Sequence, residues 1–289
     1  MKAIDIHTHV NFAAFNEDKL EVIDRALQAG VAMINVGTER GTSHAAVELA
    51  TSHERGIYAT IGLHPVHTFS AHHDTDELGG PPAGGFTSRR EEFDYNFYQK
   101  LATDPKVVAI GECGLDYFHL DRGVTELITK QREVFEAQVY LAREVGKPLM
   151  LHVRDPRPDG ATTTGLSAYA DVLTILDNYH DVIGNVHFFA GDWSIAKHFL
   201  DRGFTLSFTG VITFTHNYDE VIKQIPLDKL MVETDAPYVA PAPYRGKRNE
   251  PLYVLETLKR LAEIKGVSYE IAAATTLANA ERLFGLNLA

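Results

Sequence analysis

Short apolar runs recur along the whole chain, and segments with helical character separate them. Several runs are almost continuously apolar, as expected for parallel strands that are covered on both faces. The runs span residues 2–10, 31–37, 57–64, 107–114, 148–155, 182–189, 204–210 and 230–237. This alternation predicts an α/β fold with eight strands.

The segments between the runs carry amphipathic helix patterns. Residues 125–146 align one stripe of side chains along a helix, formed by Leu127, Val134, Gln138, Leu141 and Val145. Residues 251–266 begin with proline and end with glycine, which are typical helix boundaries. A last helix after Ser268 is expected to close one end of the fold. Eight strands alternating with helices over about 250 residues or more describe a (β/α)8 TIM barrel.

We expect a single domain over residues 1–289, since no linker, repeat or low-complexity tract interrupts the pattern. A doubly wound open sheet is the competing arrangement, because alternation alone does not show that the sheet closes. Two long connections, at residues 70–90 and 155–165, depart from the pattern. Both follow strand ends on the face where barrel enzymes hold their sites, so their role stays open.

Charge and cysteine content bear on partners and compartment. The formal net charge of −12 repels polyanions, so a nucleic-acid ligand would need a local basic patch or bound cations. The single cysteine excludes an internal disulfide framework and suits a reducing compartment. The chain starts directly with a strand-like run, without a basic and then apolar leader, and contains no apolar stretch of membrane-spanning length. We therefore expect a cytoplasmic protein without a membrane partner, and no obligate protein partner is evident.

Ionisable side chains gather at the carboxyl ends of the predicted strands. They are five histidines and two carboxylates, namely His7, His9, His64, Glu112, His152, His187 and Asp235. Each alone would be read as an ordinary hydrogen-bonded group. If the barrel closes, however, all seven converge on one cavity.

Imidazole and carboxylate ligands suit divalent metals such as zinc or manganese. Six good ligands exceed the needs of one catalytic ion, and two ions about 3.5–4 Å apart would use all of them. His7, His9 and Asp235 would hold one ion, and His152 and His187 would hold the other. Glu112 would bridge the pair. The order of strands around a closed barrel supports this division, because the first strand adjoins the eighth and the fifth adjoins the sixth.

Ordered motifs along the whole chain resemble the TatD-family metal-dependent hydrolases, within the amidohydrolase-like superfamily. The matching stretches are DIHTHV, IGLHP, AIGECGLDYF, KPLMLHVRD, NVHFFAG, VETDAPY, PYRGKRNEP and NAERLFG. The resemblance implies a TIM barrel, a deoxyribonuclease-like activity, and metal ligation by the same six residues. HFFAG departs from the HCFSG-like stretch often found in the family, which alters the packing beside His187.

Catalytic and substrate-binding roles can be assigned as hypotheses. Two divalent ions (zinc, magnesium or manganese) would activate a hydroxide, Glu112 would bridge the ions, and Asp235 would accept the proton of the attacking water. His64 is a candidate donor to substrate, or alternatively a histidine that stiffens the turn before Pro65. Four basic residues are candidate substrate contacts: Arg154, Arg245, Lys247 and Arg248. The alternative for Arg154 is an ion pair with Asp116 or Asp155, and for the other three it is a solvated or salt-bridged loop.

Three functions fit these residues. The family resemblance implies a phosphodiesterase that acts on DNA or RNA ends, with 3′-5′ exonuclease-like action. A metal-dependent amidohydrolase, esterase or deacylase acting on a small molecule or an aminoacyl group would use the same metals. A non-catalytic metal-binding scaffold is the third reading, and the complete ligand set argues against it.

Overall fold

The computed structural model describes residues 1–69, 72–73, 86–87, 90–118, 120, 124–157 and 165–288. Most of the two long connections therefore lies outside the described residues. Eight parallel strands form one sheet in the order β1-β2-β3-β6-β7-β8-β9-β10. They are β1 (Ala3–Thr8), β2 (Val31–Val36), β3 (Ile57–Ile61), β6 (Val107–Asp116), β7 (Leu149–Arg154), β8 (Gly184–Val186), β9 (Thr205–Phe208) and β10 (Leu230–Val232).

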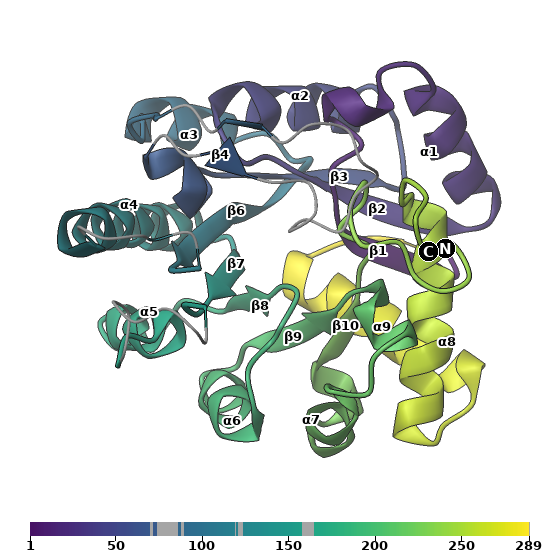
Figure 1. The fold of residues 1–289 in the computed structure, drawn as a ribbon. Coiled ribbons are helices and arrows are strands. Elements are labelled where there is room, and N and C mark those ends of the chain that lie inside the picture. The colour runs from purple at the N-terminus through teal and green to yellow at the C-terminus, as the bar shows by residue number, and fades with distance from the viewer. Residues whose placement is uncertain are drawn as a thin grey trace.

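Helices surround the strands in chain order, except the last helix, which lies across one end of the barrel (Figure 1). They are α1 (Lys19–Gln28), α2 (Arg40–Thr51), α3 (Tyr95–Leu101), α4 (Val124–Val145), α5 (Ala168–Leu176), α6 (Trp193–Asp201), α7 (Asp219–Gln224), α8 (Val254–Lys265) and α9 (Tyr269–Phe284). Short 3-10 turns are η1 (Ala13–Phe15), η2 (Pro65–Thr68), η3 (Gly210–Thr213), η4 (Leu227–Lys229) and η5 (Pro251–Tyr253). A two-stranded antiparallel pair, β4 (His72–His73) with β5 (Phe86–Thr87), lies apart from the main sheet.

The seam between the first and last strands is joined just beyond β10. Thr8 forms a parallel bridge with Ala236, and the His9 amide donates to the Ala236 carbonyl at 2.7 Å. The predicted barrel is therefore confirmed, and the open doubly wound sheet is excluded. The two ends of the chain also meet, since the amino group of Met1 donates to the carbonyl of Leu288 at 2.6 Å.

Two apolar clusters stabilise the barrel. The larger one packs the strands against the surrounding helices. The smaller one joins Ile4, Met150 and Met231 of the strands to Phe284 of α9. Asn279 of α9 also donates to the carbonyl of Leu230, where β10 begins, at 2.8 Å. Helix α9 thus covers the end of the barrel at which the strands start, which leaves the opposite end for the site.

Local helix signals behave as predicted. The Ser268 hydroxyl accepts a hydrogen bond from the Ile271 amide at the start of α9. Gly266 ends α8 with φ of 65°, a left-handed conformation that costs glycine little. Among the described residues, no helix combines the length and the apolar character that crossing a lipid bilayer requires.

Candidate metal centre

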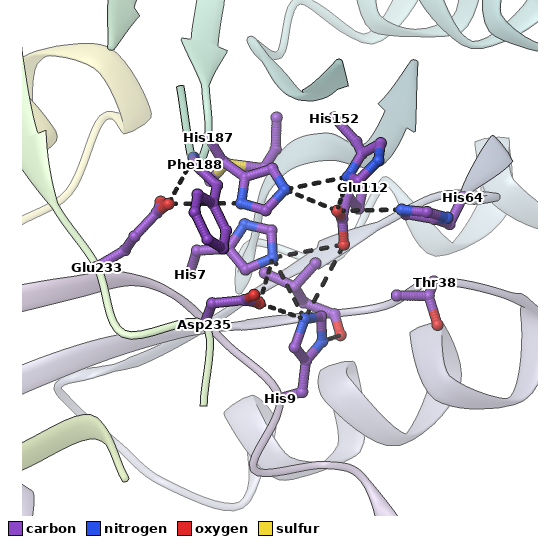
Figure 2. A network of polar contacts seen from close by, with 12 residues as sticks. His7, His9, Thr38, His64, Glu112, His152, His187, Phe188, Glu233 and Asp235 are labelled. Carbon is purple, nitrogen blue, oxygen red and sulfur yellow. Dashed lines mark hydrogen bonds and ion pairs between the residues drawn. The ribbon is translucent and has the colours of Figure 1, made fainter. Parts of the chain in front are cut away.

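The seven ionisable residues predicted to converge do lie together, at the carboxyl ends of the strands (Figure 2). Only some of them belong to strands proper. β3 ends at Ile61 and β10 at Val232, so His64 and Asp235 follow their strands by three residues. Hydrogen bonds to neighbouring segments replace the strand ladder there. The His64 amide donates to the Thr38 carbonyl at 2.8 Å, and the Asp235 amide donates to the His7 carbonyl at 2.9 Å.

Glu112 lies at the centre of the cluster, and its two carboxylate oxygens face different groups. Oε1 is 2.8 Å from His187 Nε2, 2.9 Å from His152 Nδ1 and 3.3 Å from His64 Nε2. Oε2 is 3.4 Å from His7 Nε2 and 4.0 Å from His9 Nε2. The carboxylate therefore stands between two sets of histidines.

Asp235 completes the set on the Oε2 side. Its Oδ1 is 3.4 Å from His9 Nε2 and 3.8 Å from His7 Nε2. The backbone of Asp235 has φ of 57°, in the left-handed region that a non-glycine residue adopts at some cost in free energy. The amide of Asn249 stabilises this turn by donating to the carbonyls of Thr234 at 2.9 Å and Tyr238 at 2.7 Å.

The donor set fits divalent cations. Nε2 of His7 and Nε2 of His9 are 3.3 Å apart, and Nδ1 of His152 and Nε2 of His187 are 3.4 Å apart. Two neutral imidazole nitrogens cannot satisfy each other through their lone pairs, so each pair requires a shared proton or a cation. Ligand atoms of His7, His9 and Asp235 all lie within 4.8 Å of one another, as do those of His64, Glu112 and His152. Nitrogen and oxygen donors at such spacing are those that zinc and related ions prefer.

A second layer of oxygen atoms faces the ring nitrogens that point away from the cluster. His9 Nδ1 is 3.0 Å from the Val36 carbonyl, and His152 Nε2 is 3.0 Å from Asp116 Oδ2. His187 Nδ1 is 3.5 Å from Glu233 Oε1. Such partners orient metal-binding histidines and select their tautomer. Sequence reasoning missed these roles of Asp116 and Glu233, although both carboxylates stand close to predicted ligands in the sequence.

The hydrogen bonds of His64 determine which of its ring nitrogens carries the proton. Its Nδ1 accepts a hydrogen bond from the Val66 amide at 3.2 Å, so the ring proton of the neutral form is on Nε2. Nε2 in turn faces Glu112 Oε1. The two roles considered for His64, turn-stiffening and a donor that points into the site, are thus compatible in one geometry.

Two glutamines of α4 hold the backbone next to site residues. Gln138 accepts from the Leu63 amide at 2.8 Å and donates to the Leu63 carbonyl at 3.0 Å. Gln131 makes the same pair of bonds with the backbone of Asp116, both at 2.9 Å. Both glutamine side chains are fully buried. One helix therefore positions His64 and Asp116 together.

Burial and mutual contact shift the acidities within the cluster. Burial lowers the pKa of His64 to about 3 and that of His7 to about 4, so both rings are neutral near pH 7. Burial opposes ionisation of Glu112, but the imidazoles of His64 and His187 outweigh it and hold the Glu112 pKa well below its usual range. Burial likewise opposes protonation of His187, and the negative charges of Glu112 and Glu233 raise its pKa well above the usual value. The cluster thus holds a buried carboxylate that attracts positive charge.

The family model of TatD-related DNases matches residues 4–285. This chain belongs to that family. A Bacillus subtilis protein named uncharacterized metal-dependent hydrolase YabD is 38% identical over 288 residues, covering 98% of this chain and 99% of that protein. A Citrobacter rodentium protein named 3′-5′ ssDNA/RNA exonuclease TatD is 33% identical over 294 residues, covering 98% of each. The crystal structure of YJJV, a TatD homologue from Escherichia coli K12, superposes with a TM-score of 0.79 at 25% identity, covering 99% of each chain.

The predicted family is thereby confirmed, and the protein is a metal-dependent hydrolase of the TatD family. The third alternative, a non-catalytic metal-binding scaffold, is therefore set aside. The number and identity of the metals and the roles of individual residues stay predictions.

The four basic residues predicted to bind substrate have different environments in this TatD-family protein. Arg154 stacks over the Phe118 ring, with its guanidinium carbon 3.5 Å from the ring centroid. Arg245 stacks in the same way over Phe214, at 3.7 Å. Among the residues that the structure describes, no hydrogen bond or ion pair joins either arginine to the clustered histidines.

Lys247 and Arg248, the other two basic residues, differ in exposure and in partners. Lys247 is exposed on its loop. Arg248 forms two hydrogen bonds with the carboxylate of Asp18, at 2.8 and 2.5 Å, and a third with the carbonyl of Ala14 at 2.8 Å. This is the salt-bridge alternative considered for the loop, and it ties the loop to the segment that precedes α1.

A separate hollow of about 500 Å³ lies on the outer surface of this TatD-family barrel. Its lining comes from α3, α4 and the segment after α5: Tyr95, Glu133, Glu136, Ala137, Tyr140 and Tyr179. None of the clustered histidines or carboxylates lines it. We place the functional site at the cluster because the metal-binding chemistry is there.

Proposed function

We propose that this protein hydrolyses phosphodiester bonds at the 3′ ends of single-stranded DNA or RNA, with two divalent cations bound at the cluster. The observation that supports it most directly is the placement of Glu112, whose two oxygens face two separate sets of imidazoles. A carboxylate in that position suits a bridge between two cations, as in many two-metal hydrolases. The exonuclease names of two relatives, 33% and 31% identical to this chain, favour the phosphodiester substrate.

Each cation would have its own ligands. His7, His9 and Asp235 would hold one, together with Glu112 Oε2. His152 and His187 would hold the other, together with Glu112 Oε1. When bound, the two cations would polarise the phosphoryl oxygen and make a bound water acidic enough to act as a nucleophile near neutral pH.

Asp235 is the proposed proton acceptor. Its side chain is 14% exposed, whereas that of Glu112 is 5% exposed, so Asp235 is the cluster carboxylate more open to an attacking water. The oxygen of that water bonds to phosphorus while the bond from phosphorus to the leaving oxygen breaks. Asp235 takes the proton of the water and returns it to the leaving oxygen.

His64 is proposed to stabilise negative charge on the phosphate. Its neutral ring carries the proton on Nε2, which points into the site, and its low pKa keeps it neutral over the working pH range. The ring can therefore donate a hydrogen bond without adding positive charge beside the cations.

The basic residues would bind the nucleic-acid backbone beyond the scissile bond. Lys247 and Arg245 are exposed on the loop that follows Asp235, and Arg154 lies two residues after His152 on β7. Phosphate contacts by such residues supply affinity without sequence preference. Arg248 would act indirectly, because Asp18 already engages its guanidinium.

Hydrolysis of an amide or ester bond in a small molecule is the second candidate. The net charge of −12 and the engagement of Arg248 by Asp18 both reduce the attraction for a polyanion. The same cluster would serve this reaction, since the cations would polarise a carbonyl oxygen in place of a phosphoryl oxygen.

The two candidates separate in one assay. Purified protein would be incubated with Mg²⁺, Mn²⁺ or Zn²⁺ and single-stranded DNA or RNA labelled at either the 3′ or the 5′ end, beside a panel of small esters and amides. We expect early release of a 3′-labelled mononucleotide and a descending ladder from the 5′-labelled strand. Glu112→Gln should remove this activity, and Glu144→Gln, at an exposed carboxylate of α4, should retain it. Turnover of the small-molecule panel without nucleic-acid cleavage would overturn the proposal and favour the second candidate.

A further inference from the structure

A buried row of hydrogen bonds lies behind His187, across three neighbouring strands. The Thr205 hydroxyl donates to Asn185 Oδ1 at 3.0 Å, and Asn185 Nδ2 donates to Ser207 Oγ at 2.7 Å. Ser207 Oγ then donates to Glu233 Oε2 at 2.7 Å. All four side chains are buried, and those of Asn185, Ser207 and Glu233 are inaccessible to solvent. None belongs to the predicted ligand set.

Glu233 connects this row to the metal centre through its other oxygen (Figure 2). Oε1 accepts a hydrogen bond from the Phe188 amide at 2.6 Å and lies 3.5 Å from His187 Nδ1. Phe188 has φ of 46°, a strained value for an aromatic residue, so the peptide after His187 needs such support. Glu233 thus holds the peptide after His187 by a hydrogen bond and places its charge opposite Nδ1 of the His187 ring.

The polar partners of Glu233 explain how a fully buried carboxylate can remain there. Burial of an ionised carboxylate is costly unless hydrogen bonds or a nearby positive charge compensate for it. Within the described part of the chain, the hydrogen-bond and ion-pair partners of Glu233 are Ser207, Phe188 and His187, and none is a lysine or arginine. Its charge is therefore directed at His187.

We propose that Glu233 is a positioning residue that holds the proton of His187 on Nδ1 and so turns Nε2 toward Glu112 and the cation. Asn185, Ser207 and Thr205 orient Glu233 for this purpose. This inference rests on the proposed two-cation function, and it assigns to Glu233 control of the half of the site formed by His152 and His187. Carboxylates behind metal-binding histidines commonly change metal affinity by 10–100-fold.

The test is Glu233→Gln, because glutamine keeps the size and the acceptor for the Phe188 amide but removes the charge. Isothermal titration with Zn²⁺ and Mn²⁺ would measure stoichiometry and affinity. We expect one of two cations to bind about 10–100-fold more weakly, with the other unchanged. Glu250→Gln is the matched control, since Glu250 is also a buried carboxylate but pairs with Arg25. The Glu250→Gln variant should bind both cations with the affinities of the wild type.

A spectroscopic measurement distinguishes positioning from a merely structural role. In the Zn²⁺-loaded protein, ¹H–¹⁵N spectra should show a downfield, slowly exchanging Nδ1 proton on His187, assigned by its absence in His187→Gln. This resonance should move upfield in Glu233→Gln. An unchanged resonance together with unchanged cation affinity would overturn the inference, as would ligation of Zn²⁺ by Glu233 itself.

Two further results keep this inference separate from the proposed function. Should Glu233→Gln fail to fold, Ser207→Ala decides, because it retains the carboxylate but removes its donor. Cation binding weakened several-fold supports the inference, and unchanged binding overturns it. If the wild type binds two cations and cleaves DNA while Glu233→Gln matches it, only this inference fails. If the wild type does neither, the proposed function fails, and the Nδ1 proton can still be read in the metal-free protein.

Discussion

Replacement of Gln138 by leucine tests how the helix α4 holds the site. Gln138 and Leu63 are both fully buried, so no water can replace the two hydrogen bonds between the glutamine amide and the Leu63 backbone. The substitution leaves one buried N–H and one buried C=O without partners. Each such group costs about 1–3 kcal/mol. We therefore expect Gln138→Leu to lower the free energy of unfolding by about 3 kcal/mol.

The same change should affect catalysis, because His64 directly follows Leu63. A shift of this backbone displaces His64 Nε2 from its place 3.3 Å from Glu112 Oε1. A misplacement of about 1 Å at a catalytic group can reduce turnover by as much as 100-fold. We expect a loss of about 10-fold or more in kcat, with cation stoichiometry retained because the six proposed ligands are untouched.

Urea unfolding followed by circular dichroism, and turnover of the labelled 3′ end, would measure the two effects. Gln99→Leu is the control, since Gln99 is exposed on α3 and its side chain donates a long hydrogen bond of 3.4 Å to Glu144. Its free energy of unfolding should change by less than about 0.5 kcal/mol. If Gln138→Leu also stays within 1 kcal/mol of the wild type, with full activity, our account of the Leu63 contact is wrong.

Four other substitutions have expected outcomes. Glu112→Gln should reduce turnover below detection. If this variant keeps full activity while elemental analysis finds its cations bound, the bridging role of Glu112 is contradicted. Lys247→Ala should raise KM for single-stranded DNA with little effect on thermal stability, and a KM equal to that of the wild type would refute substrate binding by Lys247. Arg248→Ala, in contrast, should lower the free energy of unfolding by about 1 kcal/mol because it breaks the ion pair with Asp18. The pKa of His64 is about 3 in the folded protein against 6.5 when unfolded, so between these values the unfolded chain binds the extra proton and stability falls as pH drops. Urea unfolding of the metal-free proteins should therefore show that, from pH 7.5 to pH 4.5, the free energy of unfolding of the wild type falls by about 2–3 kcal/mol more than that of His64→Gln. If the difference between the two free energies stays constant with pH, His64 is not buried in its neutral form.

The fold could be predicted because its signal repeats within short windows. Each apolar run and each amphipathic helix is legible over ten to twenty residues, and Pro251 and Gly266 mark the ends of one segment. The convergence of the seven ionisable residues then follows from topology alone. In a barrel of parallel strands all carboxyl ends meet on one face, so residues far apart in sequence share it.

Contacts between distant segments could not be predicted from such windows. Gln138 lies within the apolar stripe of its helix, yet its partner Leu63 is 75 residues away. The charge and position of Arg248 predict a contact with substrate, whereas its partner Asp18 is 230 residues away in the sequence. Glu233 lies in an apolar run, and only the structure shows that its charge is buried behind His187. In each case the local pattern identifies the residue but not the atom that it binds.

The seam of the barrel is a further place where contacts between distant segments complete the site. Alternation places Asp5 on the same face as His7 and His9, but pairing between β1 and β2 shifts between Asp5 and Thr8. Asp5 accepts hydrogen bonds from the Thr234 amide at 2.9 Å, beside Asp235, and from the His7 amide at 3.3 Å. Together with the bonds from Asp235 to His7 and from His9 to Ala236, this contact holds the first strand against the last. These contacts between the two ends of the sequence place His7 and His9 beside Asp235.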